Sequence, residues 1–195
     1  MNPQPVELSP KIRSRQDKTR QRIIDESARK FIEKGFENVS VEEIIDAAEI
    51  ARSSFYRFFS NREQVLENII RPVFERGNAE LEAIDSSRPE AIMTGIFETY
   101  IKLWQASPDA LRVSTRLGGV YFYLFEDVHK SFREKVVALL EQVEASGLLL
   151  NDSANYTGRL LARVAIPIME VYANTPNFEK LFHEAMSGLL LKEGK

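Results

Sequence analysis

The stretch VSVEEIIDAAEIARSSFYRFFSNREQVL, residues 39–66, holds two short helical patterns separated by only a few residues. In the first pattern Ser40 is followed three residues later by Glu43, the spacing of a capping box that satisfies free backbone N–H groups at a helix start. In the second pattern, RSSFYRFF, Phe55 and Phe59 share one side of the predicted helix. The other side carries polar side chains, namely Arg52, Ser53, Tyr56 and Arg57.

This close succession of two helices, joined by AEIA at 48–51, is the spacing of a helix-turn-helix. In that motif the second helix enters the DNA major groove, and its first residues reach base edges. The arginine fork fits guanine or a phosphate, and serine and tyrosine hydroxyls fit phosphate oxygens. Periodicity alone also allows a surface helix that has two arginines and no partner.

The segment from Thr19 to Leu66 resembles the DNA-binding domain of the tetracycline-repressor (TetR) family of bacterial regulators. The matching elements are TRQRIIDESARKFIEKGFENVSVEEIIDAA, ARSSFYRFF and SNREQVL, which cover about a quarter of the chain. The resemblance implies that Tyr56 binds a phosphate, and that Ser40 and Arg62 lie near phosphates. It places Ala51, Arg52, Ser53 and Ser54 at the front of the recognition helix, and Arg57 where bases or backbone are reached.

One residue departs from the family pattern, because the turn position usually filled by glycine is Glu49 here. A residue other than glycine tolerates a left-handed backbone poorly, so the turn is expected to differ slightly. Glu49 also brings a negative charge close to the predicted DNA surface.

The charge of the chain is unevenly distributed. The whole sequence carries a formal net charge of −3, whereas residues 1–24 hold six basic and two acidic side chains. A basic leading segment on an acidic remainder suits a polyanionic partner, although a solvated tail would have the same composition. The basic residues are Lys11, Arg13, Arg15, Lys18, Arg20 and Arg22.

Composition narrows the class of protein further. The absence of cysteine excludes disulfides and thiolate metal sites. No apolar run approaches the roughly 18 to 20 residues that a membrane span requires, and MNPQPVELSPKIRSRQ lacks the core of a signal peptide. We therefore expect a cytoplasmic protein with no membrane partner.

The helical pattern continues beyond residue 85 without any strand-like alternation. The sequence therefore predicts an all-α fold of about nine helices, built as a compact N-terminal unit and a larger helical body. The family resemblance implies that the first is a three-helix helix-turn-helix DNA-binding domain and the second a C-terminal domain for ligand binding and dimerisation. The expected divisions are a flexible basic arm over 1–14, the helix-turn-helix domain over 15–62 and the helical body over 63–195.

The last two predicted helices are apolar on more than one side. The helix over 156–172 is apolar around most of its circumference, which indicates burial on two sides. In the resembling family the last two helices form a four-helix bundle between subunits, which implies a homodimer on a palindromic operator. Burial within the subunit's own core is the alternative. The predicted interface residues are Leu161, Val164, Ile168, Phe182, Met186 and Leu189.

Aromatic residues gather in the middle of the chain and are candidates for an effector pocket. The resemblance implies a small molecule bound in the C-terminal domain, and aromatic walls suit a lipophilic or aromatic ligand. An aromatic stripe at helical spacing is also typical of ordinary core packing. The candidate pocket residues are Phe97, Tyr100, Trp104, Tyr121 and Phe122.

No pattern points to catalysis, a metal or a cofactor. The two histidines, His129 and His183, are far apart in the sequence, and the chain contains no Gly-rich phosphate loop or metal-spaced cluster. The leading hypothesis is therefore a dimeric DNA-binding regulator that is not an enzyme, most simply a repressor released by a small molecule. The alternatives are a helical small-molecule binding protein without specific DNA binding, and a DNA-binding regulator without an effector; an activator also remains open.

Overall fold

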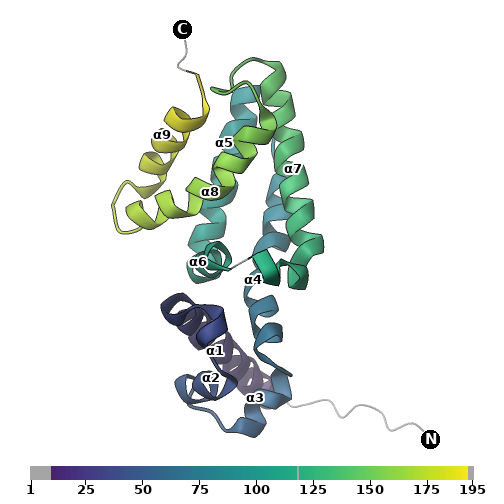
Figure 1. Cartoon of the computed structure of the whole chain (residues 1–195), viewed down its shortest axis with the longest axis vertical. Coiled ribbons are helices and arrows are strands. Elements are labelled where there is room, and N and C mark those ends of the chain that lie inside the picture. Colours follow the sequence, from purple (N-terminus) through teal and green to yellow (C-terminus); the bar gives the residue numbers. More distant parts are fainter. Residues whose placement is uncertain (1–9, 118, 193–195) are drawn as a thin grey trace, which may run out of the picture. The chain divides into compact units, whose positions relative to one another are not determined.

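The computed structural model describes residues 10–117 and 119–192, which are helical almost throughout (Figure 1). Within those ranges the one isolated β-bridge joins Leu149 to Leu191, so the all-α prediction is confirmed. The described α-helices are α1 (Pro10–Lys34), α2 (Val41–Ala47), α3 (Arg52–Phe58), α4 (Arg62–Glu82), α5 (Pro89–Ala106), α6 (Pro108–Arg116), α7 (Glu126–Ala145), α8 (Ala154–Tyr172) and α9 (Phe178–Leu190), with 3₁₀ helices η1 (Phe36–Asn38) and η2 (Gly119–Phe125).

The chain divides into two compact units, Met1–Ile69 and Ile70–Lys195. The division falls inside α4, seven residues beyond the boundary expected at residue 62. The expected arm over 1–14 lies mostly outside the described residues, but α1 already begins at Pro10. None of the described helices combines the length and apolarity that crossing a membrane requires.

The first unit is built from local signals that are visible in the sequence. Gly35 follows α1 with a φ of +80°, and its N–H donates to the Phe31 carbonyl oxygen at 3.0 Å. Glycine adopts this left-handed conformation without a Cβ clash, which explains why α1 ends there. The unit's core is made of side chains at most 5% exposed, including Ile23, Phe31, Phe36, Ile44, Phe55, Phe59, Val65 and Leu66.

The second unit is a helical body in which α5 packs against α6, α7, α8 and α9. Figure 1 shows α5 behind α8, with α7 alongside. Pro89 and Pro108 each stand in the first turn of a helix, where the missing N–H costs nothing. Nine side chains of α5 are buried, which makes this helix the centre of the body's apolar core.

Candidate nucleic-acid interface and ligand cavity

The turn between α2 and α3 fixes the direction of the second helix. The Ala48 N–H donates to the Ile44 carbonyl oxygen at 2.9 Å, and Ala48 is fully buried. The next residue, Glu49, has a φ of +49°, so the turn uses the left-handed backbone although glycine is absent. Ala51 then precedes the first helical residue of α3. The turn therefore keeps the tight geometry at the cost of local strain in Glu49.

Helix α3 has one buried and one exposed face. Phe55 and Phe59 are at most 2% exposed and their ring centroids lie 6.0 Å apart, which anchors the helix in the core of the first unit. The predicted division of faces is confirmed, because the outward side chains are Arg52, Ser53, Tyr56 and Arg57, while Ser54 is half-buried. The side chains of Ser53 and Arg57 form no hydrogen bond or ion pair with any residue that the structure describes. Their polar groups are available to a ligand.

Arg52 lies along the outer surface of α3. Its Nη1 is 2.7 Å from Glu42 Oε1 on α2, and its guanidinium lies 5.6 Å from the centre of the Tyr56 ring. Both charged side chains are more than half exposed, at 65% and 58%. A pair as exposed as this contributes at most about 1 kcal/mol, so a nucleic-acid contact can replace it at small cost.

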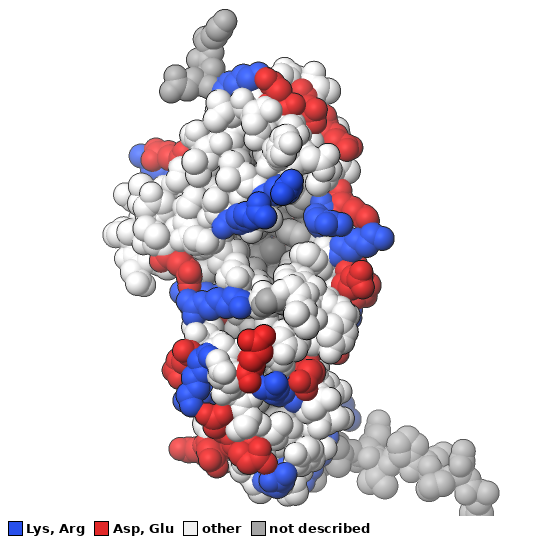
Figure 2. Space-filling view, viewed as in Figure 1, with Lys and Arg blue, Asp and Glu red and all other residues white. Residues whose placement is uncertain are grey.

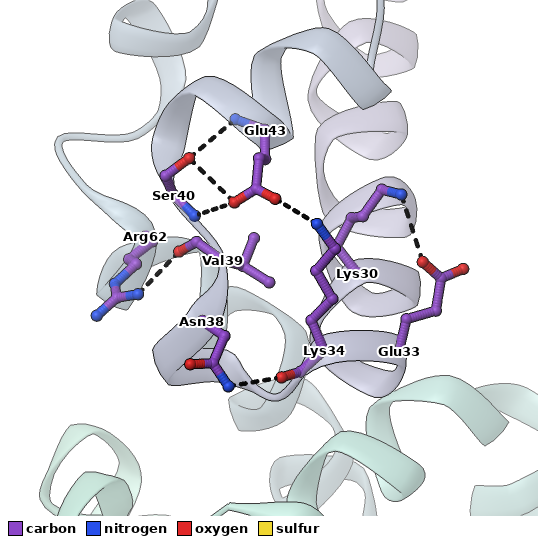
Figure 3. A network of polar contacts seen from close by, with 8 residues as sticks. All are labelled: Lys30, Glu33, Lys34, Asn38, Val39, Ser40, Glu43 and Arg62. Atoms are coloured by element: carbon purple, nitrogen blue, oxygen red, sulfur yellow. Dashed lines mark hydrogen bonds and ion pairs between the residues drawn. The ribbon is translucent and has the colours of Figure 1, made fainter.

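Ser40 has a structural role at the start of α2, where the predicted capping box is present (Figure 3). Its hydroxyl accepts from the Glu43 N–H at 3.2 Å, and its own N–H donates to Glu43 Oε2 at 2.8 Å. The hydrogen bond from Lys34, followed by those from Ser40, lowers the pKa of Glu43 to about 2. The carboxylate therefore stays ionised and holds α1 against the start of α2. Ser40 is nevertheless exposed.

Arg62 is half-buried and donates to the backbone of Val39, which sequence reasoning did not anticipate (Figure 3). Its Nη1 donates to the carbonyl oxygens of Phe36, Glu37 and Val39 at 3.0, 3.0 and 2.8 Å. Its guanidinium also lies 4.7 Å from the centre of the Phe36 ring, and Nε is 3.3 Å from Glu63 Oε1. These contacts make Arg62 a clamp on η1, and the expected phosphate contact of Arg62 stays a prediction.

Basic side chains of α1 add positive charge to the first unit. Arg20 is an exception, because it bonds to Asn68 and lies 5.6 Å from the centre of the Phe59 ring. The remaining basic residues of the leading segment are exposed and have no ion pair among the described residues: Lys11, Arg13, Arg15, Lys18 and Arg22.

The second unit contains a cavity of about 1110 Å³. Tyr100 and Phe122 line it, as the sequence predicted, whereas Phe97, Trp104 and Tyr121 are not among its lining residues. Phe97 instead packs edge-on against Phe182 with a centroid distance of 6.2 Å. The aromatic residues of α5 therefore have two different environments: Phe97 packs in the core, and Tyr100 lines the cavity.

Helix α8 has a core face, a cavity face and an outward apolar face. The expected interface has to be corrected, because Leu161, Phe182 and Met186 are fully buried in the body's own core. The other expected residues, Val164, Ile168 and Leu189, are half-buried or exposed. The outward apolar face of α8 and α9 consists of Tyr156, Leu160, Val164, Ile168, Val171, Phe178, Leu181, Ala185 and Leu189.

The two histidines lie on different helices, His129 on α7 and His183 on α9. His183 Nε2 is 2.9 Å from Glu98 Oε1, which ties α9 to α5. His129 lies in the cavity wall, with its ring 5.0 Å from Phe74 and 4.6 Å from Phe122. In the part of the chain that the structure describes, no three His, Asp or Glu side chains converge as metal ligands.

Comparisons with known proteins agree with this architecture. Residues 23–69 match the family model described as bacterial regulatory proteins, tetR family. The HTH-type transcriptional regulator TcmR of Streptomyces glaucescens is 31% identical over 85 residues, which is 43% of this chain and 38% of TcmR. The chain therefore spans well under half the length of this curated relative.

Solved structures match over most of the chain and show its fold. The ketosteroid transcriptional regulator KstR2 of Mycobacterium tuberculosis has a TM-score of 0.72 at 21% identity, covering 89% of this chain and 95% of KstR2. A SmeT–triclosan complex has a TM-score of 0.60 at 18% identity, covering 90% of this chain and 93% of SmeT.

The fold and the family match together define a helix-turn-helix domain followed by a helical body. Over residues 23–69 the chain is similar to the TetR family of bacterial regulatory proteins. The TetR-family regulators that it resembles are DNA-binding transcription factors and not enzymes.

Proposed function

We propose that the chain is a homodimeric, sequence-specific transcriptional repressor that binds a palindromic operator and is released by a small molecule. The observation that carries this proposal is the exposed polar face of α3, held outward by the buried Phe55 and Phe59. A helix that served only the core would not present two arginines and a half-exposed tyrosine on one side.

Each exposed residue of α3 suits one part of a DNA site. Arg52, Ser53 and Arg57 would read base edges, because an arginine fork matches the acceptors of guanine. Tyr56, 47% exposed, would bind a phosphate and set the register, together with Ser40. Ala51 and Ser54, at the front of α3, would allow close approach to the DNA. Arg62 would act indirectly, by holding η1 and the start of α2 in place.

The outward apolar face of α8 and α9 supports the homodimer. On this face Val171 is 75% exposed and Tyr156 is 64% exposed. Burial of their apolar surface away from water would lower the free energy. A second copy has a matching face, and a two-fold axis would bury both. Two recognition helices would then read half-sites about 34 to 36 Å apart or at a multiple of that spacing, which explains the palindrome.

The cavity of the body supports regulation by a ligand. Its volume of about 1110 Å³ accommodates a drug-sized molecule, and the SmeT structure of the same fold is a complex with triclosan. A ligand that binds the DNA-free protein more tightly than the DNA-bound protein would lower the affinity for the operator. The factor of this decrease would equal the ratio of the two ligand affinities.

Fluorescence anisotropy tests the proposal directly. The full chain is titrated against labelled DNA from upstream of its own gene and against random duplex at one fixed salt concentration, because phosphate contacts make affinity depend steeply on salt. We expect the upstream DNA to bind about 10³-fold or more tightly than the random duplex. Equal, weak binding to both would favour the alternative of a helical ligand-binding protein, and specific binding that no ligand alters would favour a regulator without an effector.

A further inference from the structure

The wall of the cavity is mostly apolar, and the hydroxyl of Tyr100 is one of the polar groups set into it. Tyr100 is 7% exposed, and its hydroxyl has no hydrogen-bond partner among residues 10–117 and 119–192. Burial raises the pKa of Tyr100, so this hydroxyl stays protonated and can donate into the cavity. The apolar lining includes Val73, Leu103, Phe132, Val136 and Ile166. An occupant must therefore have a largely apolar body.

The rim of the cavity is charged. Arg133 of α7 and Arg159 and Arg163 of α8 line the cavity and are exposed, which places them at its mouth. The described part of the chain offers none of these three a hydrogen-bonded or ionic partner. In Figure 2 the body is hollowed, and Lys or Arg side chains lie on both sides of the hollow. Three guanidinium groups thus face the entrance without a counter-ion.

The acidic side chains of the rim do not cancel this charge. Glu170 Oε1 is 3.1 Å from Arg112 Nε and 3.6 Å from Arg116 Nη2, so its charge is already balanced. Glu134 is 3.9 Å from Lys130 on its own helix. Of the acidic side chains that line the cavity, Glu141 alone has no ion pair with a described residue. The mouth is therefore net positive.

From these contacts we infer that the cavity selects an amphipathic anion. The apolar body of the ligand lies between α5, α7 and α8, and its terminal carboxylate or phosphate binds Arg133, Arg159 and Arg163. Guanidinium groups bind both kinds of anion through paired N–H donors, which a neutral or cationic head cannot use. This inference rests on the proposed effector cavity and names the chemical class of its ligand.

Calorimetric titration of the full chain without DNA tests the inference. The probes are decanoate, decyl phosphate, decanol and decyltrimethylammonium, all with the same tail and all kept below their micelle-forming concentrations. We expect both anions to bind at least about tenfold more tightly than decanol, because charge-assisted hydrogen bonds add to the burial of the tail. The cationic probe should bind most weakly.

A variant carrying Arg133→Gln, Arg159→Gln and Arg163→Gln should bind decanol like the wild type and lose its preference for the anions. Arg76→Gln is the matched control, because Arg76 is also exposed on the body but does not line the cavity; it should leave all four affinities unchanged. If decanol binds the wild type as tightly as decanoate, or if the triple variant keeps the preference, the inference is overturned while the effector cavity stands. If no probe binds, the inference is also overturned. Specific DNA binding, which decides the proposed function, is measured separately.

Discussion

Arg52 and Glu42 illustrate how a residue can be occupied in the free protein and still serve recognition. Their ion pair of 2.7 Å lies in solvent, where water and salt weaken it. It keeps the guanidinium over the Tyr56 ring and close to the surface that would face DNA. The exchange of this contact for a base or phosphate would have a small free-energy cost, so we expect Glu42 to tune the affinity for DNA and not to prevent binding.

Replacing Glu42 by glutamine should strengthen operator binding about two- to fivefold, because an exposed pair worth about 0.5–1 kcal/mol no longer competes for Arg52. Asp46→Asn is the matched control, since it removes the same charge from an exposed position of α2 that has no ion pair with a described residue. Anisotropy titrations at one salt concentration compare the two variants. Weaker binding of the Glu42→Gln variant would instead mean that the carboxylate positions Arg52 for DNA.

Glu49 carries strain that a glycine would relieve. A left-handed backbone conformation costs a residue with a Cβ about 1–2 kcal/mol. Glycine avoids this cost in the folded state, but it loses part of the gain because its unfolded chain has more conformational entropy. We expect Glu49→Gly to raise the free energy of unfolding of the first unit by about 0.5–1 kcal/mol relative to Glu49→Ala, which removes the charge but keeps the strain. Urea unfolding followed by circular dichroism measures the difference. Equal stability of the two variants would show that the turn is not strained.

Variants of Arg62 distinguish a structural role of this side chain from a phosphate contact. Losing its hydrogen bonds to three carbonyl oxygens should lower the free energy of unfolding by about 2–3 kcal/mol in Arg62→Ala. Arg62→Lys keeps the positive charge but loses the planar fork, so it should also be destabilising. If Arg62→Lys is as stable as the wild type and Arg62→Ala only lowers the salt slope of DNA binding by about one, the phosphate role is correct instead.

The helix ends and helix faces of the first unit were predicted well, because their signals lie close together in the sequence. The capping box of α2, the stop at Gly35 and the two faces of α3 each depend on residues within one or two turns. The clamp made by Arg62 escaped prediction because its carbonyl partners lie 23 to 26 residues away in the sequence and accept through their backbone. No side-chain pattern can signal such acceptors.

Helix α8 shows the limit of periodicity. A helix that is apolar around most of its circumference offers no sequence signal for which side meets the subunit's own core. The predicted interface therefore mixed two faces, with Leu161 on the core side and Val164 on the outward side. The packing of α8 against α5, α7 and α9 decides the matter, and α5 lies far from α8 in the sequence.

A charge on the outward apolar face of α8 should break the proposed dimer without harming the fold. Val171 and Val120 are both 75% exposed, but only Val171 belongs to this face. We expect Val171→Glu to weaken dimerisation at least about tenfold, since two symmetric charges would be buried, and Val120→Glu to leave it unchanged. Light scattering coupled to size exclusion measures the masses. A dimer that tolerates Val171→Glu would place the interface elsewhere.

At the scale of the whole molecule, the sequence predicted an all-helical chain with a DNA-binding head and a larger body. The ligand cavity could be predicted only in part, because an aromatic stripe has the same spacing whether it fills a core or lines a void. Tyr100 lines the cavity and Phe97 packs on Phe182, although both lie on α5 only three residues apart. The arginines at the mouth could not be predicted, because they come from two helices, α7 and α8, that both line the cavity only in the folded chain.

We propose that the exposed face of α3 reads a DNA sequence, and in vitro selection from a random duplex library measures this sequence preference. The full chain, its Arg52→Ala variant and an Arg29→Ala control from the exposed side of α1 are each used to select DNA at one fixed salt concentration. We predict that the wild type and the control enrich the same inverted repeat, and that Arg52→Ala loses about 1–3 kcal/mol of discrimination at one base position in each half-site. If the wild type enriches no sequence, or if Arg52→Ala keeps the same motif and affinity, the exposed face of α3 does not read the DNA sequence.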